Sequence, residues 1–531
     1  MLPLKEKDKP IIQMLLSAGC CARCVLRFCC VSVQAAYRQP QQETLKELRA
    51  FIVDSENSKV QDSADQDSTL ENKSHDAAVS ETHQDPPCKR VKLEPSGTST
   101  QLEELEESRV CVVCFGILQD LCGKIQAVKI AEAVKAQHYE FDTLMMSVSL
   151  PAQLSVREHS CWLHAKMKIR EKGLTLDKND VIQVKEAFKW IMQSLVGKEL
   201  GGISVVTKST FEVGMEFSHP ETDSDCHFLA KACPDCFTST KNKPSVFTRI
   251  AVIKALEKIP DAKFLKLYPC PPTQPTSCIS QNVHCLHVSV FIAGRYNKFC
   301  RSLPQTPWVI DGERRMESSV EELIAVPILS AFRADGFNFS SSGREDVDVR
   351  TLGNGRPFAM ELLNPHRSRF SKVEMKQLQE TINKSSDKIR VRDLQIVTRE
   401  AMCRMKEGEE EKTKSYTALV WTQKPIERDD ITFIDNVKDL TLDQKTPLRV
   451  LHRRALAIRQ RVIHSMTTRF LDSHHFYLGL KTQAGTYIKE FVHGDFGRTT
   501  PNLCWLLKTD TDILELDVES VDVDWPPVIP E

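Results

Sequence analysis

A long acidic stretch near the start of the chain limits what the chain can fold into. Between Asp54 and Glu107 the sequence contains no Phe, Trp or Tyr, and Ser, Asp, Glu and Gln dominate. Such a segment cannot bury enough apolar area to offset the conformational entropy of its backbone. We therefore expect a disordered acidic insertion over residues 54–107, with folded sequence on both sides of it.

The remaining sequence is typical of a soluble, intracellular protein of several domains. With 531 residues the chain is too long for one hydrophobic core, and two to four domains are expected. The first nine residues mix charges of both signs and lack the apolar core of a secretion signal. No apolar run approaches the roughly 20 residues of a membrane span, so no membrane partner is expected.

A short basic cluster lies inside the acidic stretch, at residues 86–95, and contains Lys89, Arg90 and Lys92. It resembles a monopartite nuclear import signal that importin would bind through Lys89–Leu93. The alternative is a solvated basic patch without that role. With the import reading we expect the protein in the nucleus and the cytoplasm, with the mitochondrion as a further compartment.

Two Cys-x-x-Cys pairs flank the acidic stretch. Cys21 and Cys24 precede it, whereas Cys111 and Cys114 follow it. Four thiolates suit a tetrahedral zinc ion, and the long separation costs little because loop-closure entropy grows only logarithmically with length. The sequence therefore predicts one structural zinc site. The alternative is two unrelated pairs of buried thiols.

Other cysteines complicate this prediction. The chain has 19 cysteines, and those near the first pair are Cys20, Cys29 and Cys30. A third pair, Cys233 and Cys236, has no matching partner pair by spacing, so we favour a second metal site there less.

Apolar patterns divide the folded sequence into two parts. Residues 1–53 and 108–290 combine helical patterns, at residues 11–16, 44–52 and 180–195, with strand-like patterns at 200–208 and 284–293. These patterns predict an α+β accessory domain. Residues 291–531 alternate strand-like segments, at 417–422, 461–466, 475–482 and 513–523, with helices such as 372–383. That alternation predicts a mixed sheet flanked by helices, large enough for a catalytic cleft.

A dense charge cluster occupies residues 343–350, which read Gly-Arg-Glu-Asp-Val-Asp-Val-Arg. By composition alone this is a strand with solvated charges. A carboxylate with basic neighbours can also stay ionised and act as a nucleophile or a base.

The surroundings of this cluster favour the second interpretation. Residues 340–369 continue with Leu-Gly-Asn-Gly-Arg-Pro-Phe at 352–358 and Asn-Pro-His-Arg at 364–367. This region resembles the active site of the archaeal and eukaryotic tRNA pseudouridine synthases of the Pus-ten type. The resemblance implies that Asp346 is the catalytic carboxylate, either as nucleophile or as proton-abstracting base. It fixes no role for Asp348.

Two further segments agree with the same family and supply a pocket for the target base. Residues 414–418 place Tyr416 where these enzymes stack an aromatic ring on the base, although a tyrosine in a strand is more often part of a core. Residues 485–498 also resemble the motif of the bacterial synthase that acts on the tRNA T-loop. By that resemblance Lys489 pairs with the catalytic carboxylate, while Ile488 and, less securely placed, Leu516 line the uracil pocket.

Basic residues in the same half of the chain are expected to contact RNA. Residues 449–461 include five arginines in a chain whose formal net charge is −1. By their positions in the family motifs, Arg295, Arg344 and Arg449 become candidate substrate contacts. A solvated basic face is the alternative.

The resemblance as a whole implies an α+β protein: a C-terminal pseudouridine-synthase sheet with flanking helices, after a zinc-binding, THUMP-like accessory domain. It implies isomerisation of T-loop uridines in tRNA, at positions 54 and/or 55, without a redox or organic cofactor. The alternative is a non-catalytic protein that binds structured RNA, such as primary microRNA with its processing complex. A zinc-dependent hydrolase is disfavoured because no His and carboxylate set accompanies the cysteines.

Overall fold

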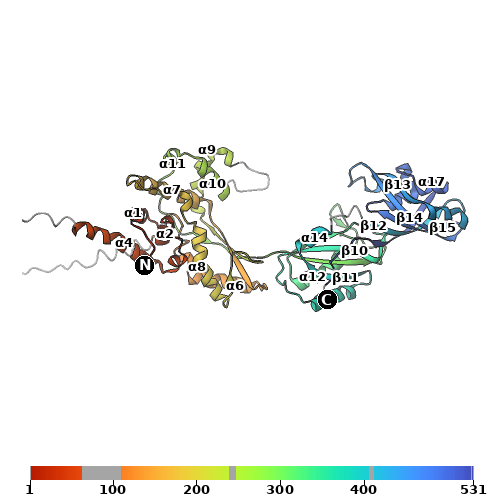
Figure 1. Ribbon diagram of the computed structural model, residues 1–531, viewed down its shortest axis with the longest axis horizontal. Helices are drawn as coiled ribbons and strands as arrows, with labels where there is room; N and C mark the ends of the chain where they lie inside the picture. Colours follow the sequence, from red (N-terminus) through yellow and green to blue (C-terminus); the bar gives the residue numbers. More distant parts are fainter. Residues whose placement is uncertain (1, 62–108, 238–246, 406–411, 528, 530–531) are drawn as a thin grey trace, which may run out of the picture. The chain divides into compact units, whose positions relative to one another are not determined.

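The computed structural model describes residues 2–61, 109–237, 247–405, 412–527 and 529. The chain forms two compact units, which are described separately below (Figure 1). Unit 1 comprises Met1–Gln137 and Phe141–Leu286, whereas unit 2 comprises His138–Glu140 and His287–Glu531. The predicted import segment and residues 62–107 of the predicted insertion lie outside the described residues.

Unit 1 begins with short helices that carry the first cysteine pair. They are α1 (Lys9–Ser17), α2 (Ala22–Phe28), α3 (Gln34–Arg38) and α4 (Gln41–Gln61). Helix α4 continues past residue 53, where the predicted insertion begins. Residues 41–61 contain neither Gly nor Pro, so no strong helix breaker ends the helix at residue 53.

The described part of unit 1 also contains a five-stranded sheet in the order β2-β1-β3-β4, with β5 paired to β3. Its strands are β1 (Thr143–Ser149), β2 (Ser204–Val205), β3 (Phe211–Ser218), β4 (Ile279–Ser280) and β5 (His284–His287). The longer helices beside it are α6 (Lys124–Ala136), α7 (Ala152–Arg170), α8 (Val184–Glu199) and α10 (Arg249–Lys258). The strand predicted at 200–208 is reduced to β2, because Gly201 and Gly202 turn the backbone at positive φ.

The described part of unit 2 contains a ten-stranded sheet in the order β11-β6-β10-β17-β12-β15-β14-β13-β16, with β9 paired to β10. The strands are β6 (Val290–Lys298), β9 (Gly336–Ser341), β10 (Arg350–Leu363), β11 (Ile389–Val397), β12 (Thr413–Thr422), β13 (Lys438–Lys445), β14 (Ile458–Asp472), β15 (His475–Gln483), β16 (Thr499–Thr500) and β17 (Thr511–Val521). Strands β10 and β17 pair in parallel, and β17 pairs with β12 antiparallel. The sheet is therefore mixed, as predicted.

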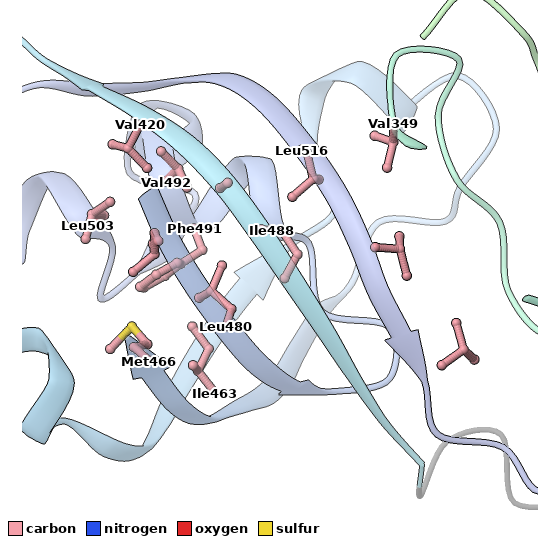
Figure 2. Packing of buried hydrophobic residues seen from close by; sticks show 14 of the residues in the cluster. Val349, Val420, Ile463, Met466, Leu480, Ile488, Phe491, Val492, Leu503 and Leu516 are labelled. Carbon is pink, nitrogen blue, oxygen red and sulfur yellow. The ribbon is translucent and has the colours of Figure 1, made fainter. Parts of the chain in front are cut away.

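Helices cover this sheet and build its two hydrophobic clusters. The principal ones are α12 (Val320–Phe332), α13 (Lys372–Ser385), α16 (Ile488–His493) and α17 (Leu503–Leu507). Met375 and Ile382 of α13 pack in one cluster together with Phe358 of β10. In the other cluster, Phe491 of α16 packs with Leu480 of β15 and Val420 of β12 (Figure 2). Within the described residues, no helix is both long and apolar enough to span a membrane.

Candidate functional site

The predicted catalytic residue lies in the carboxylate loop, residues 342–349, which joins β9 to β10. The charge cluster is therefore a loop and not the strand that composition alone suggested, because one of its acids is drawn into the protein. Glu345 is buried and accepts hydrogen bonds from Arg356 Nε at 2.6 Å and from the Tyr296 hydroxyl at 2.8 Å. Arg356 also donates to the carbonyl of Ser342 at 2.8 Å. This buried ion pair anchors the loop.

A buried lysine fixes the backbone of the same loop. Lys298, at the end of β6, donates from Nζ to the carbonyls of Leu303 at 2.7 Å, Asp346 at 3.0 Å and Val347 at 2.9 Å. Burial lowers the pKa of Lys298 to about 8, although the charge of Glu345 opposes the shift. The main chain at Asp346 is thus held independently of its side chain.

The carboxylate of Asp346 is held by two cations. Arg449 Nη1 donates to Asp346 Oδ2 at 2.8 Å, and Lys489 Nζ lies 3.4 Å from the same oxygen. Arg449 is itself held by the buried carboxylate of Glu490, whose Oε1 accepts from Arg449 Nε at 2.6 Å. Burial opposes ionisation of Arg449, but the hydrogen bond to Glu490 and the charges of Glu490 and Asp346 together raise the pKa of the guanidinium. Asp346 is thus the acid that both cations of this group contact.

Lys489 serves two carboxylates. Its Nζ donates to both oxygens of Asp348, at 2.9 and 2.8 Å, so Asp348 is a nearer partner than Asp346. Burial opposes ionisation of Asp348, but Lys489 outweighs it and lowers the pKa of the carboxyl group. Asp348 therefore competes with Asp346 for Lys489, which the sequence did not show. The expected RNA contact Arg449 is instead the closest cation to Asp346.

These groups open into a cleft of about 420 Å³. Its lining includes the predicted residues Arg344, Asp346, Tyr416, Arg449, Ile488, Lys489 and Leu516. Tyr416 is half-buried in β12, and burial raises the pKa of its hydroxyl. Ile488 and Leu516 belong to the hydrophobic cluster that contains Phe491 (Figure 2). Because both residues also line the cleft, its apolar wall is the edge of that cluster. One cleft thus combines an anchored carboxylate, an aromatic ring and an apolar wall.

Further cations line the cleft, and three of them belong to the basic stretch 449–461 that was expected to contact RNA. They are Arg356, Lys414, Arg453, Arg454 and Arg461. The lining contains two carboxylates, Glu345 and Asp346, so cations outnumber acids. The cleft is therefore locally cationic in a chain whose formal net charge is −1, which suits a polyanionic ligand.

Arg295 is the predicted site residue that the structure removes from the cleft. It is buried in β6, and its guanidinium donates to five backbone carbonyls at 2.7–2.9 Å, those of Asn354, Gly355, Val521, Val523 and Trp525. Those bonds occupy its donors and tie the end of the chain to β10. The prediction of Arg295 as an RNA contact is thus corrected, because the motif gave no information on burial.

Four cysteines of unit 1 form a second candidate site. Cys21, Cys24, Cys111 and Cys114 are all buried, and their sulfur atoms lie within 4.8 Å of one another. The Sγ atoms of Cys21 and Cys114 are 3.8 Å apart, close to the spacing of two thiolates on one tetrahedral ion with bonds of about 2.3 Å. This group can hold a metal ion.

The neighbouring cysteines are not part of that group. The Sγ of Cys20 lies 4.0 Å from that of Cys161, and Cys20 also contacts Cys111 from outside the group. Across the part of the chain that the structure describes, no second cluster of metal-ligating side chains includes Cys233 and Cys236.

Comparison with known proteins places this architecture in a family. The model of the C-terminal region of Pus10 matches residues 291–522, and the model of the eukaryotic Pus10 N-terminal region matches residues 111–285. A Mus musculus protein named tRNA pseudouridine synthase Pus10 is 57% identical, with 100% of both chains covered. This chain belongs to the Pus10 family.

Other relatives extend the likeness. The Homo sapiens protein of the same name is 54% identical over 100% of both chains. One from Thermofilum pendens is 30% identical over 78% of this chain and 77% of its own. A solved Cbf5-Nop10-Gar1 complex is 16% identical, covers 43% of this chain and 48% of that one, and has a TM-score of 0.24, too low to support an argument.

Proposed function

We propose that this chain is a tRNA pseudouridine synthase that isomerises T-loop uridines, at tRNA positions 54 and/or 55, with Asp346 as the catalytic carboxylate. One observation carries the proposal: Asp346 is held by Arg449, 2.8 Å away, in a cationic cleft with an aromatic ring and an apolar wall. The full-length relatives named tRNA pseudouridine synthase support it.

The proposed reaction fits these groups. Isomerisation breaks the bond from uracil N1 to the sugar C1′ and forms a bond from C5 to the same carbon, while a proton leaves C5 and another binds N1. No net oxidation or reduction takes place, so no redox cofactor is needed. Asp346 acts as nucleophile or as proton-abstracting base, and Arg449 and Lys489 hold its carboxylate in place.

The other lining groups hold the substrate. The ring of Tyr416 stacks on the uracil, an interaction worth roughly 1–3 kcal/mol per base. Ile488 and Leu516 form the apolar wall against which the detached base turns. Arg344, Arg453 and Arg454 bind the phosphates around the flipped nucleotide, since all three line the cleft and are exposed.

The four-cysteine group holds one structural zinc ion in this proposal. Four thiolates complete a tetrahedral shell and leave no open position for a water molecule, so the ion would stabilise unit 1 and take no part in the reaction. The same donor set argues against a zinc-dependent hydrolase.

We further propose that unit 1 is a THUMP-like RNA-binding domain, and that the protein acts in the nucleus, the cytoplasm and the mitochondrion. Importin would bind Lys89–Leu93, which lies outside the described residues. Binding of primary microRNA without catalysis remains a second proposal, supported by the cationic cleft alone.

The assignment is tested by mapping. Unmodified tRNA transcript is incubated with the purified full chain, and pseudouridines are mapped at single-nucleotide resolution. We expect new pseudouridine at position 54, 55 or both. Modification confined to other positions would contradict the substrate assignment, and no modification would contradict the activity.

A further inference from the structure

Phe496 is an apolar side chain that contributes nothing to the packing of unit 2. It lies between α16 and β16, and 95% of its surface is exposed. Its backbone is in the left-handed region, with φ +56° and ψ +37°, as is that of Asp495 with φ +47°. A bulky residue in that region is strained, and glycine would relieve the strain. Phenylalanine therefore lowers stability here, and residues that do so tend to serve function.

The loop that carries Phe496, residues 494–498, is nevertheless firmly held. The buried Asp495 carboxylate accepts a hydrogen bond from the Leu448 amide at 3.2 Å and lies 3.5 Å from Arg498 Nε. Arg498 donates from Nη2 to the carbonyl of Thr446 at 2.7 Å, and its own carbonyl accepts from the Lys445 amide at 3.0 Å. These bonds restrict the backbone conformation of the loop that carries the exposed ring.

These bonds connect the loop directly to the active-site cleft. Leu448, which the Asp495 carboxylate binds, is followed by Arg449, the closest cation to Asp346. Phe496 itself is not among the residues that line the cleft. The ring therefore lies outside the target-base pocket, but its loop is hydrogen-bonded to the segment that carries Arg449.

The surroundings of the ring indicate the chemistry of its ligand. The segment tied to its loop continues into exposed, cleft-lining arginines at 453 and 454, and Lys445 beside Arg498 is exposed as well. A rigid exposed ring on a loop bonded to a segment with exposed cations suits an unpaired nucleobase with its phosphates, because every base has a face that stacks. A preorganised ring also loses little entropy when the base binds.

We propose that Phe496 is a stacking platform for an unpaired nucleobase of the RNA substrate other than the uridine that enters the cleft. The inference rests on the proposed function, because it presumes an RNA ligand. It adds a second base-binding position and makes recognition depend on an unpaired nucleotide outside the target pocket.

The strain makes the test specific, because one substitution has opposite effects on stability and binding. For Phe496→Gly in the full chain, we expect an unchanged or higher melting temperature and about 5- to 100-fold weaker binding of a tRNA transcript and of a T-arm stem-loop. Phe496→Tyr should bind within about twofold of the wild type, since its ring stacks similarly.

A matched control separates relief of strain from loss of stacking. Asp311 is exposed, has φ +52° and lies in the turn between β7 (Val309–Ile310) and β8 (Glu313–Arg314). Asp311→Gly relieves the same kind of strain and removes a negative charge, so it should not weaken RNA binding. Replacing each unpaired nucleotide of the stem-loop by an abasic one should identify one position whose loss is not additive with Phe496→Gly.

The outcomes distinguish this inference from the proposed function. If the wild type modifies tRNA and Phe496→Gly binds RNA equally well, the stacking platform is refuted while the enzyme assignment stands. Joint loss of stability and affinity in Phe496→Gly would show a structural role and also refute it. If the wild type neither binds nor modifies tRNA, both proposals fail.

Discussion

At the scale of single residues, the carboxylate loop depends on a buried ion pair, and removal of either partner strongly destabilises the fold. The side chains of Glu345 and Arg356 are 1% and 3% exposed, and Arg356 Nε lies 2.6 Å from Glu345 Oε2. Removing one charge leaves the other desolvated without compensation, which costs about 3–5 kcal/mol in comparable pairs. The position of Asp346 therefore depends on groups that need not touch the substrate.

We expect Glu345→Gln to lower the free energy of unfolding by that amount and to reduce activity, because Asp346 loses its fixed backbone. Urea unfolding measures the first effect. The matched control is Glu313→Gln, whose pair with Arg315 is 3.4 Å long and exposed on both sides. That change should cost less than about 1 kcal/mol. Equal costs for the two variants would refute the anchoring role of Glu345.

Because of Lys298, the stability of unit 2 should depend on pH. Its pKa is lowered from 10.5 to about 8 in the folded protein, mainly by burial. Between those values the unfolded chain binds the proton that the folded chain has released, so stability rises with pH across this window. The gain is complete above about 10.5 and is lost as the pH falls through 8. Its size is on the order of 1–3 kcal/mol.

The difference in unfolding free energy between the wild type and Lys298→Met, measured from pH 7 to pH 11, should show this rise. A flat difference would show that the ammonium is not destabilised by its burial. Activity should fall over the same window, because a neutral amine can no longer donate to all three carbonyls of Leu303, Asp346 and Val347.

Sequence reasoning found the residues that line the cleft better than the residues that support them. Tyr416, Ile488 and Lys489 were predicted from short motifs, and all three line the cleft. Lys298, Glu345 and Glu490 were missed as supports, because burial turns an ordinary charged residue into an anchor and burial depends on distant segments. A lysine that ends an otherwise buried strand was the available signal for Lys298.

At the scale of elements, the two cysteine pairs connect segments that the acidic stretch separates in sequence. A metal ion bound to all four sulfurs would hold the start of α2 against residues 111–114. We expect metal analysis of the purified chain to give about one zinc per molecule. Because binding of structural zinc contributes directly to folding, removal of one ligand should destabilise unit 1.

Cys24→Ser and Cys111→Ser should each lose the metal and lower the melting temperature of unit 1. Cys403→Ser, an exposed cysteine of unit 2, should change neither quantity and serves as the control. Full zinc content in Cys24→Ser would contradict the ligand set.

The four strands and the helix predicted from residue 372 onward are present in unit 2 as β12, β14, β15, β17 and α13, because apolar alternation and capping residues are local signals. The helix predicted at 372–383 is α13, which begins at a capping box formed by Ser371 and Glu374. The pairing order was not predictable, since the parallel contact of β10 with β17 joins residues more than 160 positions apart. Strand registers of that kind depend on the whole sheet.

At the scale of the whole molecule, a formal net charge of −1 conceals the cationic cleft. Binding of tRNA should therefore weaken steeply as salt rises, by a slope of about 0.7–0.9 per phosphate contact in a plot of log affinity against log salt. Arg453→Ala with Arg454→Ala should reduce that slope by roughly 1.4–1.8. The control pair, Lys388→Ala with Arg390→Ala at β11 outside the cleft lining, should leave it unchanged.

An unchanged slope in the cleft variant would show that Arg453 and Arg454 bind no phosphate.

The division of the chain into two units could not be predicted from the sequence in full. Residues 138–140 belong to unit 2, where Tyr139 stacks on His366 with ring centroids 3.9 Å apart. A local pattern carries no signal for such a distant contact.

The central claim is that Asp346 performs the reaction in this cleft, and single-turnover pseudouridine formation by Asp346→Asn tests it most directly. The carboxamide keeps the shape but can neither stay ionised nor act as a base, so the rate should fall on the order of 10³-fold or more, with tRNA affinity and melting temperature nearly unchanged. Asp348→Asn, which only frees Lys489 from its nearer partner, should retain measurable activity. Pseudouridine formation by Asp346→Asn at the wild-type rate would contradict the account.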